Sequence, residues 1–163
     1  MSAARRARSA DARGVRIELR RRVRAWLPAP RELTRWASLA AGNGGGGREL
    51  SVCVVGAPES ARLNARFRGH AHATNVLSFP APRVPPTGSA ALGELVICPR
   101  VLRAEAHQQD KPLRAHWAHL VVHGTLHLLG YDHERAADAR RMERREIAVL
   151  KRLGFANPYR SPP

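Results

Sequence analysis

Three histidines lie within eleven residues of this chain, at positions 123, 127 and 133. His123 and His127 are four residues apart, so on a helix their imidazoles leave the same face one turn apart and can bind one ion. Gly130 is a residue type that ends helices in a left-handed turn, and a chain reversal there would bring His133 over the same face. The spacing therefore predicts a metal site formed by three neutral imidazoles.

The predicted site has the ligand number of a catalytic zinc centre. Structural zinc sites are usually closed by four protein ligands, whereas three imidazoles leave the fourth position open. A zinc ion held in this way lowers the pKa of a coordinated water molecule to about 7 and polarises phosphoryl oxygens, so hydrolysis is the expected reaction. We expect one zinc ion per chain, although three imidazoles also suit nickel, copper or iron. Surface or core histidines would be the simpler explanation for one histidine pair, but not for this combination with a third histidine and a helix-ending glycine.

Residue 124 decides between two classes of hydrolase. The spacing H-x3-H-x2-G-x2-H resembles the zinc helix of the metzincin proteases, in which a glutamate general base follows the first histidine. Position 124 is glycine, and a peptidase without its base is a poor catalyst, so a metallopeptidase is the weakest alternative. RNA fits better, because it carries its own 2′-hydroxyl nucleophile and a cationic side chain can stabilise the phosphorane.

The charge of the chain agrees with an RNA substrate. The 163 residues carry a formal net charge of +15, which favours a polyanionic partner, nucleic acid before membrane. Only Lys111 and Lys151 are lysines, so a bias toward arginine coding also contributes to this charge. No apolar run reaches the roughly 18 residues of a membrane span, and the start lacks the apolar region of a signal peptide. Cys53 and Cys98 lie in apolar, strand-like runs, as free buried cysteines do, which indicates a reducing cytoplasm.

Hydrophobic periodicity predicts the elements that must position the histidines. Strands are expected at 15–19, 50–55, 75–80 and 92–98, and Pro80 favours an edge position for the third. Helices are expected from Pro30 to the glycine-rich stretch 42–47, at 58–67 with Leu63 and Phe67 inward, from Pro99, at 112–129 and at 136–153. The segment 112–129 is apolar nearly all round, as in a helix at the centre of a domain.

These elements predict an α+β fold with one domain, in which a small mixed sheet packs around a central buried helix that carries the three-histidine, zincin-like site. A chain of this length forms one domain. We expect residues 1–13 to be a disordered basic start, residues 14–159 to form a metal-dependent hydrolase domain, and residues 160–163 to be a C-terminal tail.

Several separated motifs carry a family resemblance. The run from His123 to His133 occurs together with Leu63-Asn64, the segments 67–69 and 74–80, Leu92-Gly93-Glu94 and the segment 116–119. In this order the motifs resemble the bacterial YbeY family of ribosomal RNA maturation factors, over about residues 50–159. The resemblance implies a zinc-dependent, single-strand-specific endoribonuclease that matures the 3′ end of small-subunit (16S) ribosomal RNA and supports ribosome quality control. The implied partners are single-stranded RNA, ribosomal RNA, the small ribosomal subunit and assembly factors.

Site residues follow from the resemblance position by position. His123, His127 and His133 match the family's zinc ligands, and Arg68 matches its functional arginine. We therefore expect catalysis to depend on Arg68 and His123, with Arg68 binding phosphate or neutralising transition-state charge. An exposed arginine at a helix end is the alternative role for Arg68. A different function remains open, namely a ribosome assembly factor that binds RNA without cutting it and uses zinc only for stability.

Residues next to the predicted ligands are expected to support the site. His119 is expected to be a core histidine or a hydrogen-bond partner of a ligand, and Tyr131 to pack beneath the site. Asp132 and Glu134 flank the third histidine, and three roles are open for each: orienting an imidazole, shuttling a proton, or serving as a solvated turn acid.

Overall fold

The computed structural model describes residues 14–82 and 91–160. The predicted disordered start, residues 1–13, lies outside the described residues, as do residues 83–90, between the third and fourth predicted strands, and residues 161–163 of the predicted tail. Within the described residues, no helix is long and apolar enough to cross a membrane.

Four strands form one mixed sheet in the order β1-β2-β4-β3. Strand β1 (Arg16–Arg21) pairs in parallel with β2 (Glu49–Val54), and β2 pairs in parallel with β4 (Ala91–Ile97). Strand β3 (Val76–Pro80) is antiparallel to β4 and lies at the edge, where a proline is tolerated. The predicted mixed sheet and the edge position of its proline-ended strand are therefore confirmed.

Within the described residues, five α-helices and one 3₁₀ turn accompany the sheet, and the α-helices lie close to the predicted bounds. Pro30 and Pro99 each occupy a first helical position, where the missing N–H costs nothing, whereas Pro112 is the N-cap of its helix. The elements are α2 (Pro30–Ala41), η2 (Gly42–Gly45), α3 (Ala57–Arg68), α4 (Pro99–Gln108), α5 (Leu113–Leu128) and α6 (Ala136–Arg152).

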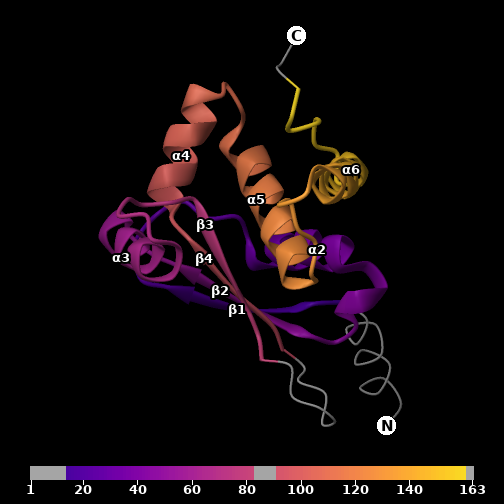
Figure 1. Cartoon of the computed structure of the whole chain (residues 1–163), viewed down its shortest axis with the longest axis horizontal. Helices are drawn as coiled ribbons and strands as arrows, with labels where there is room; N and C mark the ends of the chain where they lie inside the picture. The colour runs from indigo at the N-terminus through magenta and orange to yellow at the C-terminus, as the bar shows by residue number, and fades with distance from the viewer. Residues whose placement is uncertain (1–13, 83–90, 161–163) are drawn as a thin grey trace, which may run out of the picture.

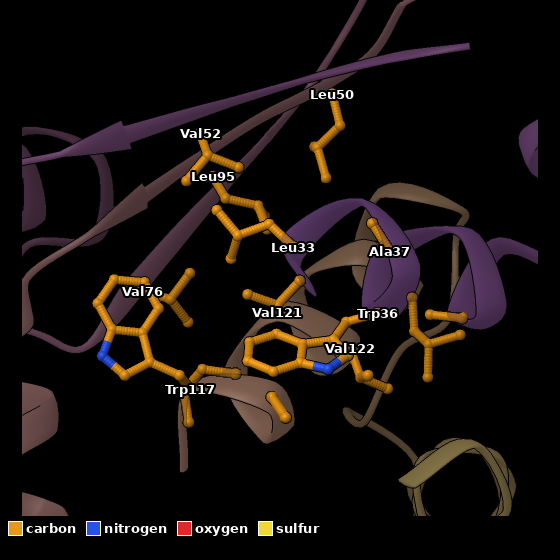
Figure 2. Packing of buried hydrophobic residues seen from close by; sticks show 14 of the residues in the cluster. Leu33, Trp36, Ala37, Leu50, Val52, Val76, Leu95, Trp117, Val121 and Val122 are labelled. Carbon is orange, nitrogen blue, oxygen red and sulfur yellow. The ribbon is translucent and has the colours of Figure 1, made fainter. Parts of the chain in front are cut away.

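The two faces of the sheet have separate apolar cores. Strand side chains alternate in direction, so Val52 and Val54 join the large cluster with α2 and α5, while Cys53 and Val55 join a smaller cluster with Leu63 of α3. Figure 2 shows residues of the large cluster, with side chains from the sheet, α2 and α5 directed toward one another. Helices α2 and α5 thus cover one face of the sheet, and α3 covers the other.

Helix α5 is the central helix that the sequence predicts. Figure 1 shows it beside the sheet, between α4 on one side and α6 on the other. Trp117, Val121, Val122 and Leu126 are each no more than 1% exposed. Burying a side chain of this size contributes about 1.5–3 kcal/mol relative to leaving it exposed, so the core holds the histidine-bearing helix firmly against the sheet.

Helix α3 packs differently from the prediction. Leu63 is only partly buried and Phe67 is 54% exposed, so the expectation that both face inward is wrong for Phe67. Phe67 instead makes an edge-to-face contact with Phe79, with ring centroids 5.0 Å apart. The fully buried positions of α3 are Ser60 and Asn64. They are polar because the inner face of this helix binds the backbone of the loop that follows it.

Candidate metal centre

The three predicted ligands meet at the C-terminal end of α5. The Nε2 atoms of His123 and His127 are 3.1 Å apart, and one ring nitrogen from each of the three histidines lies within 4.8 Å of the others. A tetrahedral zinc ion with Zn–N bonds of about 2.0–2.1 Å would place its ligand nitrogens about 3.3 Å apart. The donor set therefore fits a divalent metal that prefers imidazole, with small movements of His133.

The chain reverses just after α5 and returns His133 to the helix. Gly130 has a φ of +96°, a conformation that glycine adopts at low cost. The carboxylate of Asp132 then accepts hydrogen bonds from the backbone N–H groups of His133, at 2.6 Å, and Glu134, at 3.2 Å. Asp132 is therefore the turn acid of the three predicted alternatives, and the reversal expected at Gly130 is confirmed.

A buried carboxylate on α6 accepts hydrogen bonds from two histidines of α5. Glu146 is 0% exposed and accepts hydrogen bonds from His123 Nδ1 at 2.6 Å, from His119 Nε2 at 2.9 Å and from the Tyr159 hydroxyl. Burial acts to raise the pKa of Glu146, but the hydrogen bonds from His119 and His123 outweigh it and hold the pKa at about 2. Glu146 is therefore ionised at neutral pH although it is buried.

The charge of Glu146 fixes the tautomer of His123. Because Nδ1 points at a carboxylate, it carries the ring proton, and Nε2 has its lone pair free. That lone pair is directed at His127, where a metal ion would bind. His119, Glu146 and His123 are themselves close enough to hold an ion, but both histidines are hydrogen-bonded to the carboxylate, so the present role of Glu146 is to orient His123.

His127 is held in its neutral form. Burial lowers its pKa, and the neighbouring His123 and His133 lower it further, to about 4. Burial likewise lowers the pKa of His119. Imidazole binds metals only when it is unprotonated, so His127 is a ready ligand at neutral pH. His119 does not hydrogen-bond to a predicted ligand directly; it donates to Glu146, the carboxylate that also accepts from His123.

A second polar network consists of residues that line a cleft together with the three histidines. Glu105 of α4 accepts a hydrogen bond from His116 Nε2 at 2.7 Å and two from Asn75 Nδ2 at 3.1 Å. Burial acts to raise the pKa of Glu105, yet the hydrogen bonds from His116 and Asn75 lower it overall. This network joins α4, α5 and the start of β3 beside the histidines.

The histidines open into a cleft of about 480 Å³ that Arg68 also lines. Arg68 is the last residue of α3 and is exposed. Its positive charge contributes to the low pKa of His127, and among the described residues nothing forms an ion pair with its guanidinium. Arg68 is therefore free to bind an anion placed between it and the three imidazoles.

Polar side chains of α3 fix the loop between Arg68 and the sheet. Ser60 Oγ donates to the carbonyl of Thr74 at 3.0 Å and accepts from its N–H at 2.9 Å. Asn64 Nδ2 donates to the carbonyl of His72 at 2.8 Å. These bonds explain why Ser60 and Asn64 are buried, and they set the distance between the end of α3 and β3.

Gly124 faces the sheet instead of the cleft. A Cβ atom at this position would lie 2.7 Å from Leu95 Cδ2 and 3.4 Å from Ser78 Oγ. Any side chain here would push α5 away from β4. The packing therefore explains why the position that holds a glutamate in the metzincin pattern is glycine in this chain.

Gly124→Ala is expected to destabilise the protein by about 1–3 kcal/mol, because overpacking a filled core forces neighbours out of their rotamers. Denaturant unfolding measures the change. Leu95→Val removes both Cδ atoms, so adding Gly124→Ala to that variant should cost much less and reveal the better helix propensity of alanine. Equal costs in the two backgrounds would contradict the proposed clash.

Comparison with known proteins now identifies the family. The family model described as Endoribonuclease YbeY matches residues 16–154. The chain belongs to this family. Endoribonuclease YbeY of Alkalilimnicola ehrlichii is 51% identical over 141 residues, which cover 84% of this chain and 85% of that relative. The predicted family and the predicted class of enzyme, an endoribonuclease and hence a hydrolase, are confirmed.

A solved structure supports the fold of the family. The solution structure of TM1509 from Thermotoga maritima is similar to this chain, with a TM-score of 0.52 and 22% identity, over 90% of this chain and 99% of that one. At this identity the likeness shows the fold alone, and it agrees with the predicted α+β class.

Glu146 is the residue that sequence reasoning missed. The final helix carries many charges, and none of its acids was predicted to take part in the site. A signal was nevertheless available, because Glu146 lies four residues after Met142 and four before Leu150, on the stripe that α6 buries. An acid inside an apolar stripe opposite a histidine-bearing helix indicates a buried hydrogen-bond acceptor.

Proposed function

We propose that this member of the YbeY family is a zinc-dependent endoribonuclease that cuts single-stranded RNA in the three-histidine cleft, with residues 14–159 as its catalytic domain. The observation that carries the proposal is the convergence of three imidazole nitrogens within 4.8 Å in a cleft that Arg68 also lines. His123, His127 and His133 would hold the metal ion. Zinc in such a set supplies Lewis acidity toward a phosphoryl oxygen and lowers the pKa of a water molecule.

Glu146 and Arg68 would have separate roles in the reaction. Glu146 keeps the Nδ1 proton on His123, so that this imidazole presents its lone pair to the metal. Arg68 would grip the scissile phosphate and neutralise the charge that develops on its oxygens, as a planar guanidinium does well. Catalysis would therefore depend on His123 as well as Arg68, because His123 is a metal ligand and Glu146 of α6 fixes its orientation.

The substrate we propose is ribosomal RNA, at the 3′ end of the small-subunit (16S) species, with the small ribosomal subunit and assembly factors as partners in the cytoplasm. The net charge of +15 supports a polyanionic partner. Cys53 and Cys98 are free and buried, which agrees with a reducing compartment. Single-strand specificity is tested by comparing one RNA sequence alone and annealed to its complement.

Arg68→Glu tests the proposed chemistry directly. We expect the variant to keep its metal and lose at least about 100-fold in cleavage rate, as when one transition-state donor is removed. Metal content and cleavage of single-stranded RNA are measured on the same purified samples. Arg66→Glu is the matched control, because Arg66 is exposed on the same helix, lies over the Phe67 ring and is not part of the cleft lining.

The two variants carry the same charge change, so a general electrostatic effect would lower cleavage equally in both. A folded Arg68→Glu protein that cleaves RNA at the wild-type rate would exclude the proposed role of Arg68. Loss of metal from Arg68→Glu would instead indicate that the substitution disturbs the histidine cluster.

A further inference from the structure

A second cleft lies at the carboxyl ends of the three parallel strands. It has a volume of about 380 Å³, and its walls come from the segments 23–26, 55–58 and 99–103, which follow β1, β2 and β4, together with the start of α5. None of its lining residues lines the three-histidine cleft. In sheets with parallel strands, ligands bind at this end, where the loops and the helix N-termini meet. The position is therefore one where a second ligand is expected.

The cleft is positively charged. Arg24, Arg100 and Arg103 line it, all three are exposed, and no acidic side chain is among its described lining residues. Glu59, in the first turn of α3, is already paired with Arg22. Arg100 and Arg103 are three residues apart on α4, so their side chains lie on one face. Together these charges favour an anion.

The backbone around the cleft also favours an anion. Helices α3 and α4 both begin here, and neither has a side-chain hydrogen bond at its N-cap. Helix N-termini carry free N–H groups and partial positive charge, which suit phosphate. Two helices of 12 and 10 residues thus direct their positive ends to the same cleft.

An unpartnered buried donor is independent evidence for a ligand. Trp117 is 1% exposed and lines the cleft, and its indole Nε1 has no hydrogen-bond partner among the described residues. Figure 2 shows this nitrogen on the side of the ring that faces away from Trp36 and Val121. A buried donor without an acceptor is costly, and a ligand oxygen entering from the cleft would supply the acceptor once the atoms that cover the indole nitrogen move aside.

An exposed aromatic ring completes the cleft. Trp26 also lines it and is 47% exposed, and such rings stack on nucleic acid bases. We propose that this cleft binds a nucleoside phosphate unit, with the phosphate held by Arg100 and Arg103 and the base stacked on Trp26. The unit comes either from an RNA strand that continues beyond the active cleft, which rests on the proposed function, or from a free mononucleotide.

Tryptophan fluorescence can report on this site, because Trp26 is exposed while Trp36 and Trp117 are 3% and 1% exposed. The probes are adenosine monophosphate, inorganic phosphate and a single-stranded 12-nucleotide RNA, the last tested on a His127→Ala background so that it is not cut. Arg100→Glu/Arg103→Glu is compared with Arg140→Glu/Arg144→Glu, which changes the charge equally on exposed positions of α6. Each sample is checked for folding.

We expect the Arg100/Arg103 variant to bind at least one nucleotide probe about tenfold or more weakly than the wild type. The slope of log affinity for RNA against log salt concentration should fall by about two, one for each lost phosphate contact. The Arg140/Arg144 variant should bind like the wild type. Trp26→Leu should weaken nucleotide binding about tenfold through lost stacking, which is measured by titration calorimetry because this variant lacks the exposed fluorophore. An effect on RNA alone identifies a strand as the source, and an effect on adenosine monophosphate identifies a free nucleotide.

Three results would overturn the proposal: no binding of either nucleotide probe at the cleft, equal losses in the two arginine variants, or inorganic phosphate binding as tightly as adenosine monophosphate. Cleavage of a short RNA by the wild type is measured separately. Absence of cleavage in the wild type would contradict the proposed function but leave the mononucleotide result standing, so the two failures can be distinguished.

Discussion

His127→Ala is expected to lose its metal ion and at least about 100-fold of its RNA cleavage while remaining folded. Among the described residues only two further imidazoles, those of His123 and His133, meet at this point, and two neutral ligands hold zinc far more weakly than three. The loss of metal affinity should exceed the 10- to 100-fold loss that is typical when a residue hydrogen-bonded to a metal ligand is removed. His127 is only partly buried, so the fold should survive the substitution.

Metal content, circular dichroism and cleavage of single-stranded RNA are measured on the same samples, so that a trace of contaminating ribonuclease cannot be mistaken for activity. His107→Ala is the matched control, because His107 is exposed on α4 and does not line the cleft. A folded His127→Ala protein with one metal ion and normal cleavage would refute the site. Wild-type protein that binds zinc and RNA but cuts no faster than the variant would favour the assembly factor that does not cut RNA.

The sequence predicts the three histidine ligands, but it does not predict the buried carboxylate that orients one of them. His123, His127 and His133 are close along the chain, so helix geometry and one glycine are enough to bring them together. Glu146 reaches His123 across 23 residues of sequence, and only the packing of α6 on α5 makes that contact. Local periodicity cannot show which helix lies opposite another.

The error at Phe67 has a similar physical origin. A spacing of four between Leu63 and Phe67 indicates one apolar face, and such a face usually packs inward. Here the loop after α3 needs hydrogen bonds for its carbonyl and N–H groups, and Ser60 and Asn64 supply them from the buried side of the helix. Satisfying buried backbone groups has taken precedence over burying an aromatic ring.

The strand and helix positions were predictable because their signals are local. Prolines mark the starts of α2 and α4, and the continuous apolar character of α5 reflects contact with the sheet on one side and helices on the others. The pairing order β1-β2-β4-β3 was not predictable in the same way, since it depends on contacts between strands far apart in the chain.

Glu146→Gln is expected to weaken metal binding about 10- to 100-fold, although Glu146 is not itself one of the three proposed ligands. Glutamine has nearly the same volume but no charge, and its amide offers one acceptor oxygen where the carboxylate now accepts from His119, His123 and Tyr159. The N–H₂ group would face one of these donors. His123 would then lose its fixed tautomer, and its Nε2 lone pair would be available only part of the time.

Metal affinity is measured by competition with a chelating dye, and cleavage is measured at limiting and at saturating zinc. If Glu146 positions His123, the cleavage lost at limiting zinc should recover substantially at saturating zinc. Circular dichroism of the metal-free variant checks its folding separately, because bound metal also stabilises a weakened fold. Glu143→Gln is the control, because it makes the same chemical change at an exposed position of α6. Unchanged zinc affinity in a folded Glu146→Gln protein would show that the orientation of His123 is set by the packing of α5 alone, and that the buried carboxylate serves only to satisfy its hydrogen-bond donors.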